Sequence, residues 1–217
     1  NGVTFKNLTI YTDDDGDHHI TISNGDAIFQ DVVFILQIDS LSESGFIYNN
    51  ATNDNVAKFI NCQLIGGKTG ANYFIFFETA VDMKILRVNE LEVLNITTNG
   101  AVGIFELFRI DNAATINKCL FNNVNMIDYS ITYQGCSVLA AHGIAKKIAF
   151  NGYWANSSTL TNGNSYSRPI AMWQAGETVQ IANMNITVRE HTVIIASNLE
   201  VANFRQVGDG TIHCDFD

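Results

Sequence analysis

The chain has 217 residues, only 16% of them charged, and a formal net charge of −10. This acidity argues against nucleic acid and anionic membrane surfaces as partners, because both require basic patches. No apolar run approaches the roughly 20 residues of a membrane-spanning helix, so we expect no membrane insertion.

A pattern of alternating apolar residues begins near the N-terminus and recurs along the chain, most clearly over residues 57–65. There the alternation slips by one residue at Asn61 and then resumes. Alternation predicts a strand with one buried face, and the slip predicts a sharp bend. We therefore expect two short strands that meet at a corner, with Asn61 in the left-handed conformation that Asn, Asp and Gly tolerate best.

Copies of this unit can be aligned by an apolar anchor two places before each corner. The anchors are Phe5, Phe29, Phe59, Val88, Ile116, Phe150, Ile181 and Val201. The corresponding corner residues are Asn7, Asp31, Asn61, Glu90, Lys118, Gly152, Asn183 and Asn203. A third apolar segment lies between corners, for example at residues 19–22, 46–48, 73–77, 104–108, 137–139, 170–173 and 193–195. Each repeat thus predicts three short strands separated by turns.

Repeats of this kind predict a solenoid, in which like positions stack about 4.8 Å apart and the corner side chains form a ladder. The alternation with a ladder Asn resembles the right-handed parallel β-helix superfamily, which has the pectin-lyase-like fold. We predict one all-β domain over residues 1–217, a right-handed parallel β-helix of about eight coils with three short strands per coil. Open solenoid ends are sticky, so we expect a neighbouring domain or subunit to cap them.

The four cysteines, Cys62, Cys119, Cys136 and Cys214, show no metal-binding or redox spacing. We expect buried free thiols. The repeat alignment places Cys62 and Cys119 in one column two coils apart, about 9–10 Å, which is too far for a disulfide.

The most acidic stretch follows the first corner. Its alternate carboxylates Asp13, Asp15 and Asp17 could bind Ca²⁺ through oxygen ligands, and a solvated turn is the alternative. His18 and His19 come next and would point to opposite faces of a strand.

Two segments resemble the pectin esterases. Residues 27–41 resemble the segment that ends in Gln-Asp-Thr-Leu, and residues 45–62 resemble the following one, Asp-Phe-Ile-Phe-Gly and then Ala-x-Phe-x-Asn-Cys. In that family the Gln contributes to the oxyanion hole, the first Asp is the general acid and the second Asp is the nucleophile. Asp39 matches the acid, but Ile38 and Gly45 occupy the other two positions. The resemblance therefore implies shared β-helix ancestry without esterase activity, since neither residue can perform the chemistry.

Glycoside cleavage requires two carboxylates about 5–9.5 Å apart. The candidates on neighbouring coils are Asp39, Glu78 and Glu106, paired as Asp39 with Glu78 or Glu78 with Glu106. In the sequence no His or Arg constellation accompanies them. The dipeptide His142-Gly143 resembles the His-Gly of polygalacturonases, but the other motifs of that family are absent, so we expect no catalytic role for it.

Aromatic residues are candidates for carbohydrate binding, because sugar rings stack on flat aromatic faces. The candidates are Tyr48, Tyr73, Tyr129, Tyr133, Tyr153, Trp154, Tyr166 and Trp173, with packing in the core or turns as the alternative. An irregular insertion runs from Tyr153 and Trp154 to Tyr166, and it is the expected binding loop. We therefore select Tyr153, Trp154, Tyr166 and Trp173 as the ligand-binding residues.

A complete structural repeat beside incomplete catalytic motifs predicts a non-catalytic, extracellular or surface-exposed module that binds carbohydrate or serves as a structural spacer. Two alternatives stay open. One is a segment of a tailspike-like trimer on a virion surface. The other is a polysaccharide-degrading hydrolase or lyase with a carboxylate pair on the helix face.

Overall fold

Every described element of the computed structural model is a β-strand, and every described strand pairing is parallel. No helix of the described part of the chain is long and apolar enough to cross a membrane. Side chains are described for residues 2–11, 18–36, 46–51, 54–66, 75–95, 106–111, 113–125 and 138–149, and only the backbone is described elsewhere. The structure describes residues 2–12, 18–36, 45–51, 54–66, 68–69, 73–95, 97–98, 104–111, 113–127, 130–131, 135–156, 158–160, 166–172, 178–188, 191–193, 200–201, 204–206 and 211–215.

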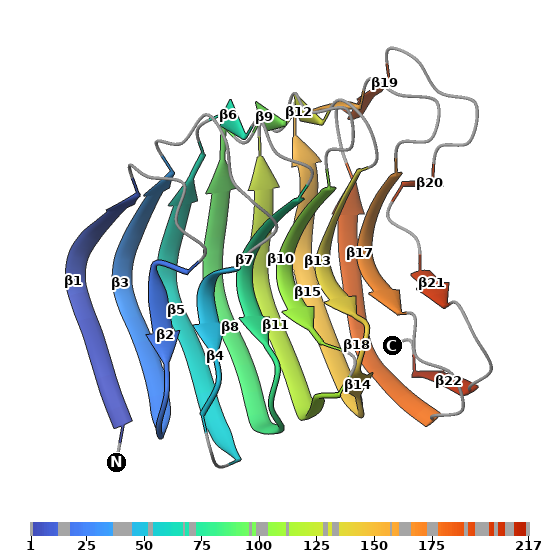
Figure 1. The fold of residues 1–217 in the computed structure, drawn as a ribbon. Coiled ribbons are helices and arrows are strands. Elements are labelled where there is room, and N and C mark those ends of the chain that lie inside the picture. The colour runs from blue at the N-terminus through green and yellow to red at the C-terminus, as the bar shows by residue number, and fades with distance from the viewer. Residues whose placement is uncertain are drawn as a thin grey trace.

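The longest strands form sheet A, in which neighbours along the sheet lie side by side in chain order (Figure 1). Its path, within the described residues, joins eight strands. They are β1 (Gly2–Thr12), β3 (Asp26–Leu36), β5 (Asn55–Ile65), β8 (Met83–Leu94), β11 (Thr115–Ile127), β15 (Lys147–Asn156), β18 (Thr178–Val188) and β22 (Thr211–Asp215), with β14 (Ile144–Ala145) paired to β11.

Two further sheets complete the coil. Sheet B contains β2 (Ile20–Ile22), β4 (Gly45–Asn49), β7 (Tyr73–Thr79), β10 (Ile104–Ile110), β13 (Gly135–Ala141), β17 (Tyr166–Met172), β20 (Glu200–Val201) and β21 (Phe204–Gln206). Sheet C contains the short strands β6 (Lys68–Thr69), β9 (Thr97–Thr98), β12 (Ser130–Ile131), β16 (Ser158–Leu160) and β19 (His191–Val193).

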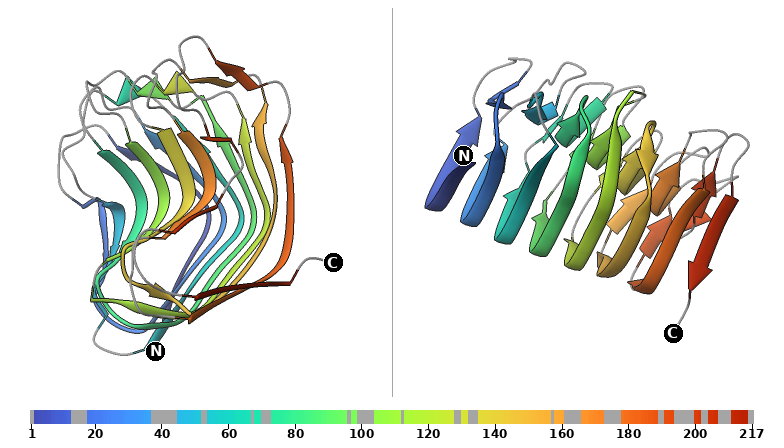
Figure 2. Two further views of the ribbon diagram at one scale, coloured as in Figure 1. Left: turned by 90° about the vertical axis from the view of Figure 1, so that its right-hand side faces the viewer. Right: turned by 90° about the horizontal axis from the view of Figure 1, so that it is seen from below.

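The chain visits the three sheets in turn. From β5 in sheet A it passes through β6 in sheet C and β7 in sheet B, and returns to sheet A at β8. Viewed along the stack, the strands of each sheet lie one behind another around a common interior (Figure 2). The predicted all-β parallel β-helix is therefore confirmed.

The predicted corners are confirmed at four positions. Asn7, Asp31, Asn61 and Glu90 have positive φ angles of 54°, 54°, 51° and 61°. Each lies inside a single long strand of sheet A and bends it. One rung of the predicted ladder is formed where Asn61 Nδ2 donates a hydrogen bond of 2.8 Å to Asp31 Oδ1 on the previous coil.

The fifth corner was predicted five residues too early in the chain. Phe121, not Ile116, pairs with the anchor Val88, and Asn123, not Lys118, has the positive φ of 55°. Judged by apolar alternation alone, residues 115–127 fit both the predicted and the observed alignment. Asn123 is the better corner because its short polar side chain tolerates the left-handed region at less cost than Lys.

The last two repeats also differ from the prediction. Ile181 pairs with Ile148 rather than Phe150, and Phe150 pairs with Met184 after an irregularity in the β15–β18 ladder between Ala149 and Phe150. Val201 lies in sheet B and pairs with Ser167, whereas the eighth strand of sheet A is β22. The segment at residues 193–195 was expected to resemble those of sheet B, but β19 belongs to sheet C. Alternation reveals which face is buried but not which sheet a short strand joins.

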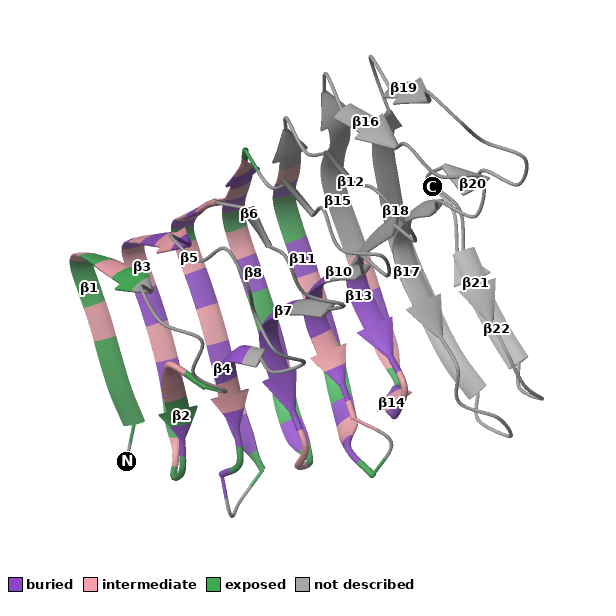
Figure 3. Ribbon diagram, turned by 45° about the horizontal axis from the view of Figure 1, so that its top comes forward, coloured by how far each residue is buried: buried purple, intermediate pink, exposed green. Residues whose placement is uncertain are grey.

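Phenylalanine side chains make up much of the core. Phe5, Phe29 and Phe59 stack in one column of sheet A, with ring centroids 4.9 and 5.0 Å apart. Phe59 also contacts Phe108 of sheet B at 5.5 Å. Buried residues accordingly alternate with intermediate or exposed ones as bands along β3, β5 and β8 (Figure 3). This packing buries the inner face of sheet B against sheet A, and alternate residues of its strands point outward.

The expectation for the described cysteines is confirmed in one respect and wrong in another. Cys62 and Cys119 are free and buried, as predicted. They do not share a column, since Cys62 pairs with Leu91 and Cys119 with Leu86. The error follows from the shifted fifth repeat.

Candidate functional site

Polar side chains meet on the outer face of sheet B, where β4, β7 and β10 lie side by side. Phe77 and Phe108 are fully buried in the core, so the next residue on each strand, Glu78 or Arg109, points to the other face. The register aligns Tyr48 with Glu78 and Glu78 with Arg109. Three side chains that are about 30 residues apart in sequence thus become immediate neighbours.

Arg109 is the centre of an ion-pair network. Its Nε lies 3.3 Å from Asp111 Oδ1 and 3.6 Å from Glu78 Oε1, and its Nη1 lies 4.0 Å from Glu106 Oε2. On the other side of Glu106, Oε1 lies 3.7 Å from His142 Nε2. We call Glu78, Glu106, Arg109, Asp111 and His142 the Glu–Arg–His cluster.

The cluster has a buried base and a more exposed rim. The side chain of Glu106 is only 3% exposed, whereas those of Arg109, His142 and Asp111 are 24%, 25% and 34% exposed. Glu106 Oε2 is buried and has no hydrogen-bond partner within the described part of the chain. A ligand on this face would therefore touch the rim, with Glu106 below it.

A tight turn positions His142. The amides of His142 and Gly143 both donate to Ile110 O at 2.9 Å, and Ala114 N donates to Asp111 O at 2.9 Å. A Cβ atom at position 143 would overlap the carbonyl oxygens of Asp111 and Ala114. Only Gly allows the two turns to approach this closely, and that approach brings His142 to Glu106.

An aromatic pair borders the cluster. The rings of His18 and Tyr48 are stacked, with centroids 4.3 Å apart and an interplanar angle of 6°. Desolvation, followed by the negative charges of Glu78 and Asp111, raises the pKa of Tyr48 above its ordinary value. Tyr48 therefore remains a neutral phenol at neutral pH and offers both a flat face and a hydroxyl group.

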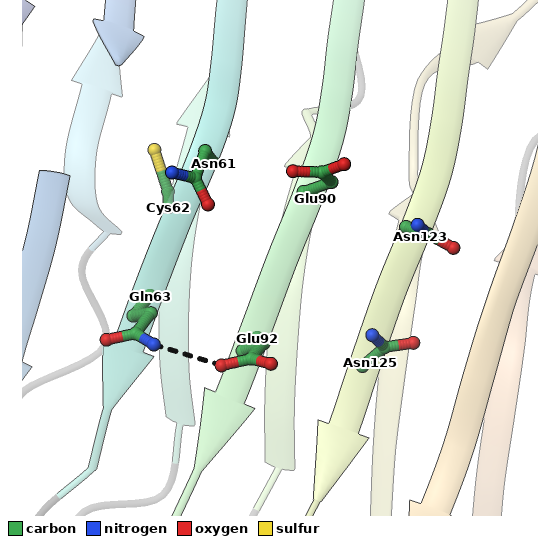
Figure 4. A pocket seen from close by; sticks show the side chains of 7 residues that line it. All are labelled: Asn61, Cys62, Gln63, Glu90, Glu92, Asn123 and Asn125. Atoms are coloured by element: carbon green, nitrogen blue, oxygen red, sulfur yellow. Dashed lines mark hydrogen bonds between the residues drawn. The ribbon is translucent and has the colours of Figure 1, made fainter. Parts of the chain in front are cut away.

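A hollow, which we call the polar groove, lies elsewhere, on sheet A at the corner (Figure 4). Its volume is about 310 Å³. Gln63 Nε2 donates to Glu92 Oε2 at 3.0 Å across neighbouring coils. The lining residues are Asn61, Cys62, Gln63, Glu90, Glu92, Asn123 and Asn125, from β5, β8 and β11. The sequence did not predict this groove, because the shifted fifth repeat removed Asn123 from the corner column.

The structure brings together two of the three predicted carboxylates. Glu78 and Glu106 share Arg109, so the expectation that no Arg or His accompanies them is wrong. Asp39 lies outside the described residues. Gly45, which stands at the nucleophile position of the esterase resemblance, pairs with Ile75, and Ile75 pairs with Glu106. A carboxylate thus occupies the same column, two strands further along.

The structure describes the predicted aromatic and metal-binding residues only in part. Tyr153 and Trp154 lie in β15 and Tyr166 begins β17, but their side chains are not described, and Trp173 lies outside the described residues. Asp13, Asp15 and Asp17 also lie outside them. Among the residues that the structure does describe, no group of three or more His, Cys, Asp or Glu is arranged to hold a metal ion.

A comparison of the chain with known protein families, curated proteins and solved structures gives no match. Arg109 could have been suspected from the repeats, since it follows Phe108 as Glu78 follows Phe77. His142 had no such signal, because it reaches Glu106 only through the turn at Gly143.

Proposed function

We propose that this chain is a carbohydrate-binding β-helix protein whose ligand lies across the outer face of sheet B. The observation that carries the proposal is the position of Tyr48, stacked on His18 and in register beside Glu78. An aromatic face accepts the apolar face of a sugar ring. Carboxylates and a guanidinium group beside it can bind hydroxyl groups through charge-assisted hydrogen bonds.

The proposed module is non-catalytic and acts outside the cell or on a surface. Arg109 lies within ion-pair distance of three carboxylates, which favours a preorganised binding surface over a free acid–base pair. Ancestry shared with the pectin-lyase-like proteins belongs to the same proposal. Ca²⁺ binding at Asp13, Asp15 and Asp17 is a separate proposal, to be tested by the melting temperature with Ca²⁺ and with chelator.

A glycan array followed by calorimetric titration tests the binding function. For a glycan bound by the wild type, Tyr48→Ala should weaken binding about tenfold, as expected for the loss of one aromatic contact. Tyr11→Ala is the matched control, because Tyr11 is 59% exposed on β1 of sheet A. Equal affinities of wild type and Tyr48→Ala would remove Tyr48 from the site, and an array without binding would reject the function.

Glycan cleavage is the second candidate, and one observation favours it. Glu106 lies within 4.0 Å of both Arg109 and His142, and Glu78 shares the same Arg. Such a carboxylate pair could supply a general acid and a base or nucleophile. Release of reducing ends from neutral and charged glycans tests it. Turnover that is lost in Glu106→Gln and retained in Glu92→Gln, which alters the remote polar groove, would establish the enzyme.

A further inference from the structure

We infer that the carbohydrate bound at the Glu–Arg–His cluster carries a protonated amine, as an amino sugar does. The inference rests on the proposed function and specifies its ligand. It begins from the charge of the cluster. Three carboxylates, of Glu78, Glu106 and Asp111, surround the single guanidinium of Arg109. Negative charge is therefore in excess, and a cationic ligand group would balance part of it.

The single positive charge of Arg109 is shared among three carboxylates and cannot neutralise all of them. Its closest approach, 3.3 Å, is to the most exposed of them, Asp111. Its distance to the most buried, Glu106, is 4.0 Å, and its Nε forms no hydrogen bond within the described structure. None of these contacts has the short, paired geometry of a bidentate Arg–carboxylate bridge. Within the described residues, Glu106 Oε2 therefore remains a buried acceptor without a hydrogen-bond donor.

The buried position of Glu106 strengthens the electrostatic effect of its charge on a ligand. A carboxylate that is 3% exposed is poorly screened by water, and its Oε2 accepts no hydrogen bond from the described residues. Its field acts on the rim formed by Arg109, His142 and Asp111. A ligand ammonium group at this rim would contact Asp111 directly and would be attracted from below by Glu106 and by Glu78, whose side chain is only 11% exposed.

The surroundings agree with a cationic ligand. The net charge of −10 attracts cations and repels polymers of uronic acids. The next cationic position in the column of Glu106 is Arg168, which pairs with Ser137, the register partner of Glu106. The backbone of Arg168 is therefore two strands from Glu106, about 10 Å away.

The test compares glycans that differ only at the amine: the glucosamine tetramer, its N-acetylated form and the glucose tetramer. Titration calorimetry with the whole chain, at low and high salt, measures the three affinities. We expect the glucosamine tetramer to bind at least about tenfold more tightly than the acetylated form at low salt. The preference should shrink at about 0.5 M salt, because screening weakens interactions between exposed charges.

Variants test whether the preference for the amine arises from the cluster. Asp111→Asn removes a rim contact, and Glu106→Gln removes the buried charge without touching the ligand. Both should reduce the amine preference to about threefold or less. The matched control, Glu92→Gln, changes the net charge equally but lies in the polar groove, so it should keep the full preference. Thermal melts establish that each variant is folded, and Asp111→Asn suffices if Glu106→Gln does not fold.

The outcomes separate the two proposals. A preference that is lost in the cluster variants and kept in Glu92→Gln supports the inference. Equal binding of amine and acetylated glycans overturns it and leaves carbohydrate binding standing. A preference that also disappears in Glu92→Gln reflects the net charge alone and overturns it as well. Failure of all glycans to bind, here and on the array, overturns both.

Discussion

Gly143 is the residue on which the geometry of the cluster depends most directly. The close approach of the Asp111–Ala114 turn leaves no room for a Cβ atom at position 143. We predict that Gly143→Ala lowers the free energy of unfolding by about 1–3 kcal/mol, the usual cost of overpacking. It should also weaken glycan binding as much as His142→Ala does, because both remove His142 from its place.

Urea denaturation and titration of the same samples measure the two effects. His142→Ala separates them, since it deletes the side chain without forcing the backbone apart. A fully stable Gly143→Ala protein with wild-type affinity would show that the turn does not position His142.

The two described thiols predict a pH dependence of stability. Burial raises the pKa of Cys119 strongly, and burial is also the largest cause of the raised pKa of Cys62. A raised folded pKa means that the native state holds protons which the unfolded chain releases above the ordinary thiol pKa of 9.0. Their contribution to stability is therefore complete below that pH and declines as the pH rises further.

Denaturation at pH 8 and pH 10 measures this decline, and Cys119→Ala should reduce it. A thiol reagent at pH 8 should leave both cysteines of the native protein unmodified and react with them once urea unfolds the chain. Rapid modification of the native protein would contradict the burial of these thiols.

At the scale of the strand, the corner decides how sheet A bends. Asp31, Asn61, Glu90 and Asn123 take the same left-handed conformation on successive coils, although Glu tolerates it less well than Asn. Glu90→Asn should therefore raise the free energy of unfolding by about 0.5–1 kcal/mol. The reverse change, Asn61→Glu, should lower it and also lose the hydrogen bond to Asp31.

Denaturation curves of the two variants test the corner. Glu92→Gln is the control, because Glu92 lies two residues beyond Glu90 at an ordinary strand position. A loss of stability in Glu90→Asn would mean that the Glu side chain contributes more than its backbone strain removes.

The aromatic column is the second feature at this scale. Phe59 is fully buried and contacts Phe29, Phe76, Phe77 and Phe108, which joins the inner faces of sheets A and B. We predict that Phe59→Ala costs about 3–5 kcal/mol, the range for large cavities in cores. Phe59→Leu, which keeps most of the volume, should cost much less. Similar losses for the two variants would contradict the packing seen here.

At the scale of the whole molecule, the exposed edge is β1. Within the described residues β1 pairs only with β3, and it exposes Val3 and Tyr11 by 44% and 59%. An uncovered edge of a parallel sheet is a template for another strand. The chain should therefore associate with itself as its concentration rises, and a Val3→Lys, Tyr11→Lys double variant should associate less. Sedimentation measures both, and a monomer at all concentrations would contradict the prediction.

Much of the coil could be predicted from single residues. The apolar alternation around Phe29, Phe59 and Val88 specifies the buried face, and the slips at Asp31 and Asn61 specify the bends. These are local properties of a strand, so they can be read without knowing its neighbours. The later repeats could not be read in this way, because two apolar alignments of residues 115–127 satisfy the same local rule.

The sequence by itself determined the parallel β-helix, four of its corners and the candidate carboxylates Glu78 and Glu106. Only the tertiary structure decided the corner at Asn123 and the meeting of Arg109 and His142 with those carboxylates. The physical reason is the parallel ladder. It brings together residues that are about 30 positions apart, and its register depends on how whole coils pack rather than on any one strand.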